Sequence, residues 1–128
     1  MVAISLVRSK VREPTLTLFR AQNGYCAGCG HRLPPIGDLC LIVNCPSIDH
    51  FIARARGGGD HIGNMLLMHS RCNSAKGDRD PTGCERIWHQ VVLAALDMHP
   101  ADIAWNNAAP TNPAMAVALS ALFDRNEA

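Results

Sequence analysis

Two pairs of potential metal ligands constrain this chain more than any other feature of its sequence. They are Cys26-x-x-Cys29 and His69-x-x-Cys72, and they lie 40 positions apart. The first pair has the spacing of a zinc knuckle and the second that of a helix start, and three Cys with one His satisfy a tetrahedral zinc site. The spacing therefore predicts a structural zinc ion on Cys26, Cys29, His69 and Cys72. The alternative is a set of buried thiols beside a surface histidine.

Length and composition favour a single globular domain. The chain has 128 residues and a mass of 13.8 kDa, enough for one hydrophobic core. Its residues are 48% hydrophobic and 18% charged, which is typical of a folded chain rather than a disordered one. Aromatic residues make up only 5%, so the core must be mostly aliphatic. A protein that binds single strands by stacking on their bases is therefore disfavoured.

The sequence argues against a membrane protein. Residues 103–123 are uncharged, but Asn and Pro interrupt this run and would leave polar groups unpaired in lipid. The N-terminus carries too short an apolar run for a secretory signal. We therefore expect a cytoplasmic protein with reduced cysteines, in which a Cys-x-x-Cys pair is more often a metal site than a disulfide.

Charge is distributed unevenly along the chain. Residues 1–79 contain ten Lys and Arg against five Asp and Glu, whereas residues 80–128 contain two against six. The net charge of +1 therefore combines a basic front with an acidic back. A basic front is compatible with an anionic partner such as nucleic acid, although ordinary surface charge has the same appearance.

Hydrophobic periodicity and turn signals predict a mixed set of short elements. Residues 1–14 read as a loosely ordered basic arm. Helices are expected at 15–22, from about 71 to Gly77, at 85–96 and from Asn112 to about 125, and strands at 39–43, 48–52 and 65–68. The two late helices have apolar stripes and carry no evident chemistry, so we interpret them as packing or oligomer surfaces.

The residues between the two ligand pairs form an ordered series. Ile48-Asp49-His50-Phe51-Ile52 is followed by Gly57-Gly58-Gly59, then Asn64, then Cys72-Asn73-Ser74-Ala75-Lys76-Gly77. This order, inside a Cys-x-x-Cys zinc frame, resembles the HNH endonuclease family. The resemblance covers roughly residues 19–79. It implies a ββα-metal unit, in which a β-hairpin packs on a helix with a catalytic metal between them.

The resemblance also implies roles for individual residues. His50 would be the general base, since a neutral imidazole can take a proton from water near pH 7. Asp49 would bind the catalytic divalent ion, and Asn64 would orient the base. Asn73 occupies the position of the second histidine, so the chain reads H-N-N. An Asp and Asn oxygen pair suits Mg²⁺ or Mn²⁺, with other divalent ions possible.

Two features depart from simple expectations. His69 stands where the family more often has a zinc-binding Cys. Asp49 and His50 are neighbours on an expected strand, where successive side chains point to opposite faces. Both can serve one site only if the chain twists or bulges there, and Pro46 just upstream is compatible with such irregularity.

The implied reaction is metal-assisted hydrolysis of a DNA phosphodiester that leaves 5′-phosphate and 3′-hydroxyl ends. Basic residues that surround the site in sequence are candidates for phosphate contacts. They are Arg54, Arg56, Arg71, Lys76 and Arg79.

Two further groups of residues receive lesser roles. Gly57, Gly58 and Gly59 read as a flexible turn that lets the hairpin approach DNA, because the loop lacks the Gly-Lys-Ser/Thr ending of a phosphate cradle. Asp60 and His61 are near enough in sequence to be additional ligands. Cys40, Cys45 and Cys84 are interpreted as core cysteines, with a second metal pair at Cys40-x4-Cys45 as the alternative.

The prediction is therefore an α+β protein with a small ββα-metal core, a Cys3His zinc site and a helical C-terminal extension. Residues 1–14 would be the arm, 15–83 the HNH nuclease core, and 84–128 the extension packed on the same domain. The leading function is a metal-dependent DNA endonuclease. Alternatives are a zinc-stabilised DNA-binding module and a partner-dependent nuclease subunit of a phage or mobile-element machine. A homodimer or a larger packaging assembly also stays open.

Overall fold

The computed structural model describes residues 6–100. Its strands are β1 (Leu6–Arg8), β2 (Leu39–Leu41), β3 (Pro46–His50) and β4 (Met65–His69), and its helices are α1 (Glu13–Ala21), α2 (Ser70–Lys76) and α3 (Gly83–Ala95). Two 3-10 turns, Arg54–Arg56 and Ile62–Asn64, lie between β3 and β4. The predicted α+β class is confirmed, with two small sheets and three helices in this part of the chain.

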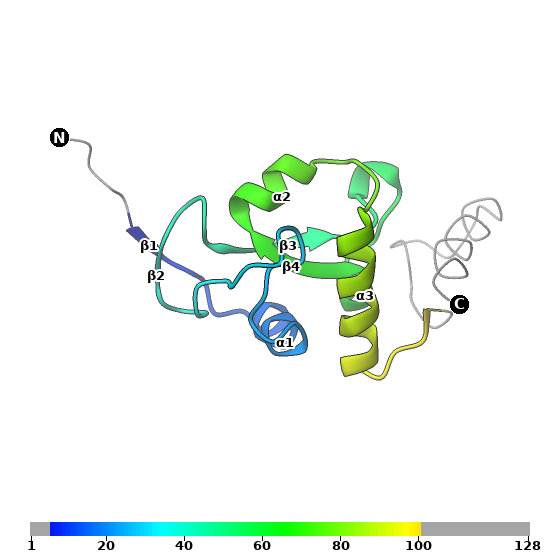
Figure 1. The fold of residues 1–128 in the computed structure, drawn as a ribbon, viewed down its shortest axis with the longest axis horizontal. Coiled ribbons are helices and arrows are strands. Elements are labelled where there is room, and N and C mark those ends of the chain that lie inside the picture. The colour runs from blue at the N-terminus through cyan, green and yellow to red at the C-terminus, as the bar shows by residue number, and fades with distance from the viewer. Residues whose placement is uncertain (1–5, 101–128) are drawn as a thin grey trace.

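The hairpin of β3 and β4 is the centre of the fold. The strands pair antiparallel, from Pro46 opposite His69 to His50 opposite Met65. In Figure 1, α2 lies above this hairpin, α1 lies below it, and α3 runs across its end. Pro46 is the first residue of β3 and does not interrupt the strand, a position at which a missing backbone N–H is tolerated.

The core is packed around β4. Leu66, Leu67 and Met68 are consecutive and fully buried, because helices cover both faces of the hairpin. Leu18 of α1 and Val92 of α3 complete this mostly aliphatic cluster. Successive side chains of a strand point to opposite faces, so three buried apolar residues in a row require cover on both faces. The hairpin therefore lies between helices.

Within the predicted arm, residues 6–8 and 13–14 form regular structure. Residues Leu6–Arg8 form β1, which pairs antiparallel with β2 from Leu6 opposite Leu41 to Arg8 opposite Leu39. Helix α1 then begins at Glu13, two positions before the expected start, with Pro14 in its first turn, where proline needs no hydrogen-bond partner.

Cys40 is buried, as expected for a core cysteine, but Cys40 and Cys45 are not free thiols. Their Cα atoms lie 5.5 Å apart and the two residues form a disulfide. Strand β2 ends at Leu41 instead of continuing to residue 43, and the turn that follows brings Cys45 back beside Cys40. The same pairing removes the alternative of a second metal site at these residues. Cys84 is a free and exposed thiol.

Helix α3 starts earlier than its periodicity suggests. Thr82 caps it by accepting from the backbone N–H of Glu85, while the Glu85 carboxylate accepts from the backbone of Thr82, a reciprocal capping box. The predicted last helix, from Asn112 to about residue 125, lies outside the described residues. Within residues 6–100, no helix is both long and apolar enough to cross a membrane.

Candidate metal centres and catalytic site

The four residues predicted to hold zinc lie together. Cys26 and Cys29 come from the turn after α1, His69 ends β4, and Cys72 lies in the first turn of α2. One ligand atom from each lies within 4.8 Å of the others. The Cys29 Sγ and His69 Nδ1 atoms are 3.4 Å apart, which is the spacing expected for two ligands of one tetrahedral ion.

Hydrogen bonds orient these ligands toward one point. His69 Nε2 donates to the Arg32 carbonyl at 3.0 Å, which leaves Nδ1 with a lone pair that faces the cysteines. Cys26 Sγ accepts from the backbone N–H groups of Gly28 and His69, each at 3.3 Å. Such bonds stabilise a thiolate, so the residues present fit a structural zinc ion.

Electrostatics in the cluster follow from crowding three thiols together. Burial, and then the negative charges of Cys26 and Cys29, raise the pKa of the Cys72 thiol to about 12. Burial also lowers the pKa of His69, which favours the neutral imidazole that binds metals. A dication would relieve the repulsion between the thiolates, and this is how a closed zinc site contributes to folding.

Asp49 is a buried carboxylate beside the second candidate metal site. Its side chain is 4% exposed, and Oδ2 lies 3.2 Å from Lys76 Nζ without making a hydrogen bond. Burial raises the pKa of Asp49 to about 6, while the charges of Lys76 and His50 oppose that rise. A buried carboxylate whose partner is one lysine ammonium keeps oxygen lone pairs that a hard divalent cation prefers.

Lys76 does not occupy the position predicted for a phosphate contact. Its side chain is 0% exposed, and its ammonium donates to the carbonyl of His50 at 2.7 Å and pairs with Asp49. The expectation of a DNA contact is wrong for this residue, because a buried ammonium needs a counter-charge and acceptors close by. Lys76 instead fastens α2 to the end of β3.

Asn73 lies on α2 next to the same strand. Its Nδ2 donates to Ser47 Oγ at 2.8 Å and to the Ile48 carbonyl at 3.1 Å. Both bonds use the amide nitrogen, so the oxygen of the amide stays available as a neutral ligand. Asn73 and Asp49 therefore supply oxygen donors on the α2 side of β3, the donor set that Mg²⁺ and Mn²⁺ prefer.

His50 ends β3 and is held by an acidic partner. Its Nε2 lies 2.8 Å from Asp60 Oδ1, and Arg54 reaches the same carboxylate oxygen at 2.5 Å. The Arg54 Nε atom also lies 3.3 Å from His50 Nε2. The shorter contact with the carboxylate decides the tautomer, since only a protonated Nε2 can donate to Asp60. Nδ1 is then the basic nitrogen.

Asn64 is fully buried and shapes the loop between the strands. Its Oδ1 accepts from the Ile52 N–H at 2.8 Å, and its Nδ2 donates to the carbonyls of Ile52 and Gly59. Its backbone carbonyl accepts from the Phe51 N–H. These bonds fix the backbone directly after His50, and none of them joins Asn64 to the His50 ring.

The glycine loop is packed against this asparagine. Gly58 and Gly59 are buried, and a Cβ on Gly58 would lie 1.7 Å from the Ile52 carbonyl oxygen. The loop therefore packs closely against the Ile52 backbone and is not an open turn. Glycine is required at Gly58 because a side chain would not fit in this close approach. The packed loop presents Asp60 to His50. His61 uses its Nδ1 to accept from the Gly63 N–H.

Each of the four arginines predicted to contact DNA is partly engaged elsewhere. Arg54 pairs with Asp60, Arg56 with Asp80 at 3.2 Å, and Arg79 with Glu85 at 3.0 Å. Arg71 donates to Asn44. All four keep exposed side chains, so they can face a ligand, but three have a carboxylate to neutralise them.

The sequence predicts Asp60 as an additional metal ligand and Lys76 as a phosphate contact, and neither prediction includes the partner that the structure gives the residue. The signal for Asp60 was its position directly after the glycine loop. Its pairing with His50 depends on the path of that loop, which no local pattern specifies.

Comparison with known proteins finds a family match for part of the chain. A family model described as HNH endonuclease matches residues 26–79. This segment runs from the first zinc-ligand candidate through α2, so it contains both candidate metal centres. No curated protein sequence matches the chain.

Proposed function

We propose that this chain, whose residues 26–79 match a family model described as HNH endonuclease, is a metal-dependent DNA endonuclease. The observation that carries the proposal is a buried carboxylate next in sequence to an imidazole held by an acidic partner, at the end of one strand. Asp49 Oδ2 is buried with Lys76 Nζ as its ion-pair partner, and His50, the last residue of β3, lies 2.8 Å from Asp60 Oδ1. The register of β3 with β4 is regular through both residues, so the change of direction that lets both serve one site has to come where the chain leaves β3 at His50. A protein that only binds DNA needs neither feature.

In the proposed reaction, His50 Nδ1 takes a proton from a water molecule that attacks the phosphorus atom. Asp60 accepts a hydrogen bond from Nε2–H and favours the imidazolium that forms. Asp49 and Asn73 would hold a divalent ion, which supplies neutralisation of the phosphate and of the leaving 3′ oxygen. The products would carry 5′-phosphate and 3′-hydroxyl ends.

Neighbouring residues would hold this arrangement in place. Asn64 fixes the loop that follows His50, and Lys76 balances the Asp49 charge before the ion binds. Arg54, Arg56, Arg71 and Arg79 would contact phosphates with their exposed side chains. The proposed organisation is an N-terminal segment, a nuclease core to about residue 83, and a helical extension that begins with α3.

The proposal is tested by plasmid cleavage in parallel reactions that contain EDTA, Mg²⁺, Mn²⁺, Ni²⁺ or Zn²⁺. His50→Ala is compared with the wild type, and His99→Ala serves as a matched control on an exposed histidine outside the site. Cutting that needs metal, and that is lost only in His50→Ala, would support the enzyme. Folded protein that shifts DNA in a gel but never cuts it would instead favour a binding module or a partner-dependent subunit.

A further inference from the structure

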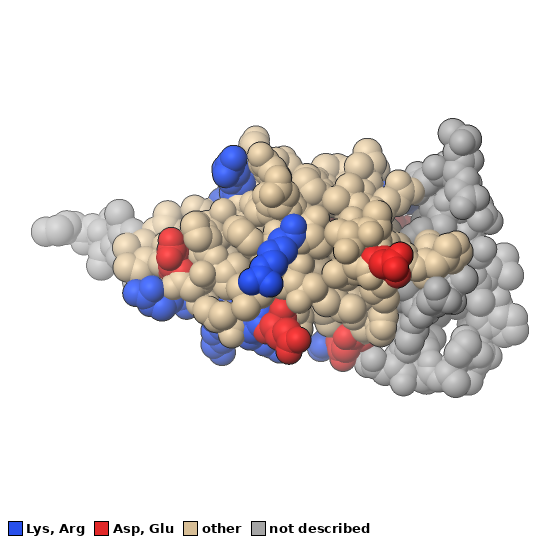
Figure 2. Space-filling model, turned by 90° about the horizontal axis from the view of Figure 1, so that it is seen from below, with Lys and Arg blue, Asp and Glu red and all other residues tan. Residues whose placement is uncertain are grey.

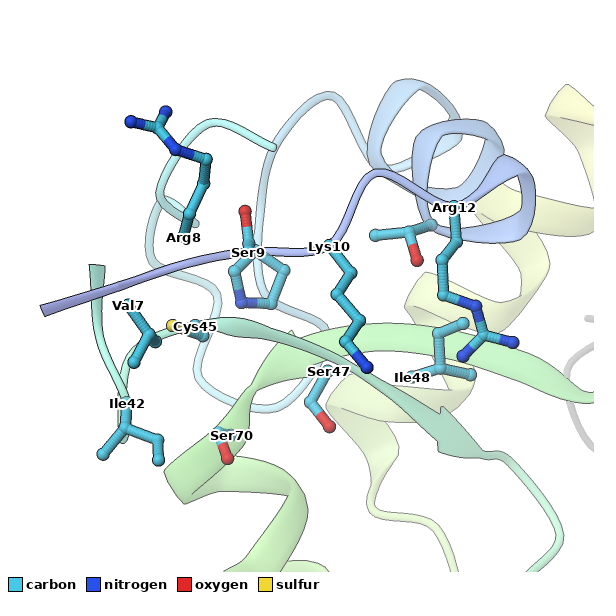
Figure 3. A pocket seen from close by; sticks show the side chains of 12 residues that line it. Val7, Arg8, Ser9, Lys10, Arg12, Ile42, Cys45, Ser47, Ile48 and Ser70 are labelled. Atoms are coloured by element: carbon cyan, nitrogen blue, oxygen red, sulfur yellow. The ribbon is translucent and has the colours of Figure 1, made fainter. Parts of the chain in front are cut away.

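A groove of about 420 Å³ lies between the N-terminal segment and β3. Figure 3 shows Lys10 and Arg12 directed down from the N-terminal segment toward Ser47 and Ile48 of the strand. Ser70, at the start of α2, adds a second hydroxyl to the lining. The groove therefore combines two flexible cations with hydroxyl groups, which are the groups that contact phosphate oxygens.

The wall that carries these cations is fixed by the fold. Gly37 N–H donates to Ser9 Oγ at 2.7 Å, and Ser9 N–H donates to the Asp38 carbonyl. Arg8, which also lines the groove, donates to the Gly37 carbonyl at 2.7 Å. Figure 3 shows its guanidinium directed away from Lys10 and Arg12. The Lys10 and Arg12 backbone is thus anchored on the β1 side, and at its other end the Arg12 carbonyl accepts from Leu16 N–H in α1.

The opposite wall of the groove, formed by the end of the β2–β3 turn and by β3, is also fixed to neighbouring elements. The Cys40–Cys45 disulfide joins β2, which pairs with β1, to the residue before β3. Ser70 N–H donates to the Cys45 carbonyl at 2.8 Å and ties the same turn to α2. Both walls are therefore in place without a ligand, which lowers the ordering cost of binding.

Lys10 and Arg12 differ from the arginines near His50 in having no counter-charge. Within residues 6–100, neither side chain makes an ion pair or a hydrogen bond, and both are exposed. Arg54, Arg56 and Arg79 are paired with carboxylates. The face seen in Figure 2 shows basic side chains separated by wide uncharged areas and accompanied by acidic ones. Lys10 and Arg12, which have no counter-charge and lie at the groove, are therefore better placed than the paired arginines to neutralise the charge of an anionic ligand.

The groove leads directly to the proposed catalytic site. Ser47 lines the groove and accepts from Asn73 Nδ2, the candidate metal ligand, at 2.8 Å. Ile48 lines it as well, and His50 follows two residues further on, about 7 Å along a strand that rises about 3.3 Å per residue. A single DNA strand that lies along β3 could therefore contact Lys10 and Arg12 and also reach His50.

We propose that this groove binds the DNA backbone beside the scissile phosphate, with Lys10 and Arg12 each neutralising one phosphate. The inference rests on the proposed nuclease function, and it adds a contact surface outside the segment matched by the family model. The ligand is a DNA phosphodiester chain, and the groove would set its direction across the site. Phosphate contacts of this kind position a duplex without reading its sequence.

The test separates binding from cutting. Anisotropy of a labelled DNA duplex is followed without added Mg²⁺ or Mn²⁺ and without chelator, so that the structural zinc is kept, with the His50→Ala protein and with the same protein carrying Lys10→Gln and Arg12→Gln, over a range of salt concentrations. Each neutralised phosphate contributes about 0.9 to the slope of log K against log salt. We expect the slope to become shallower by about 1.8, with correspondingly weaker binding at low salt. Lys10→Gln and Arg12→Gln are also measured singly, and Arg20→Gln, an exposed arginine of α1 outside the groove, removes one charge and is the control for each single variant.

A variant of opposite sign guards against misfolding of the double variant. Ile42 lines the groove and is 63% exposed, so Ile42→Lys adds a cation there without opening the core. It should tighten binding and steepen the slope by about 0.9. Effects no larger than that of Arg20→Gln, or an unchanged affinity in Ile42→Lys, would overturn the groove. Failure of the nuclease proposal would appear separately, as binding through the groove with no metal-dependent cutting by the wild type.

Discussion

Lys76 Nζ lies 3.2 Å from Asp49 Oδ2, and both side chains are buried, at 0% and 4% exposure. The pair joins α2 to β3 at the position that we propose for a catalytic ion. Without the ammonium, the carboxylate would be a buried charge with no compensation, and its pKa would rise above its present value of about 6. The lysine therefore keeps Asp49 ionised near neutral pH while the metal is absent.

Lys76→Met should destabilise the protein more at pH 8 than at pH 5. Removing one partner of a buried pair costs about 3–5 kcal/mol, because the other charge is left uncompensated. At pH 5 the Asp49 carboxyl takes up a proton and escapes most of this cost. Urea unfolding at both pH values measures the difference. The double variant Lys76→Met with Asp49→Asn should regain stability at pH 8, and an equal loss at both pH values would contradict the interpretation.

Asp60→Asn should slow cleavage without weakening DNA binding. A neutral amide stabilises the positive charge that the His50 ring takes up in the proposed reaction less than the carboxylate does. General-base catalysis as a whole contributes about 10²–10⁴-fold, so we expect a loss of no more than that. The rate should fall with little change in KM, which a general loss of structure would not cause. Asp80→Asn, which frees Arg56 in the same way, is the matched control. Equal rates in the two variants would remove Asp60 from the proposal.

Cys26→Ser should abolish zinc binding and unfold the domain. Cys26 is fully buried and accepts two backbone hydrogen bonds, and a structural zinc ion contributes its binding free energy to folding. Zinc content by mass spectrometry and the circular dichroism melting curve report the two effects. His69→Cys keeps four ligands and should retain the metal, and Cys84→Ser should change neither readout. A stable Cys26→Ser protein would mean that no metal holds this cluster.

His89 should make the fold less stable as pH falls from about 6.5 to about 4. Burial lowers the pKa of His89 to about 4. In the folded protein the neutral ring stacks on Phe51 and donates from Nε2 to the Gly63 carbonyl. The unfolded chain binds the proton more readily, so stability is full above pH 6.5 and decreases by up to about 3 kcal/mol toward pH 4. Unfolding of His89→Gln across this range should show a shallower pH dependence than the wild type. Parallel curves would contradict the assignment.

Gly58→Ala should destabilise the protein, whereas Gly83→Ala should not. A Cβ at Gly58 would lie 1.7 Å from the Ile52 carbonyl and 2.9 Å from Asn64 Nδ2, so the loop that presents Asp60 would have to move. A Cβ at Gly83 meets nothing within 4 Å. Thermal unfolding of both variants gives the comparison, and cleavage by Gly58→Ala should fall with its stability. Equal melting temperatures would show that the loop yields easily.

The sequence determined those features that depend on residue type and local spacing. Two ligand pairs of fixed spacing indicated the zinc cluster, because few residue types bind zinc. The order Asp49-His50, Asn64, Asn73 indicated the resemblance to HNH endonucleases, and a family model of that description matches residues 26–79. Apolar runs located β3, β4 and α3 to within a few positions. Their exact starts were missed where capping decided them, as with Thr82 and Glu85 at α3.

Tertiary structure decided which of these residues meet. Whether Lys76 faces solvent or Asp49 depends on how α2 packs on β3, and whether Asp60 reaches His50 depends on the path of a buried glycine loop. The Cys40–Cys45 disulfide depends on where β2 turns. Residue patterns specify periodicity and ligand chemistry over a few positions, whereas contacts between segments arise only when burial of the common core fixes the segments against one another.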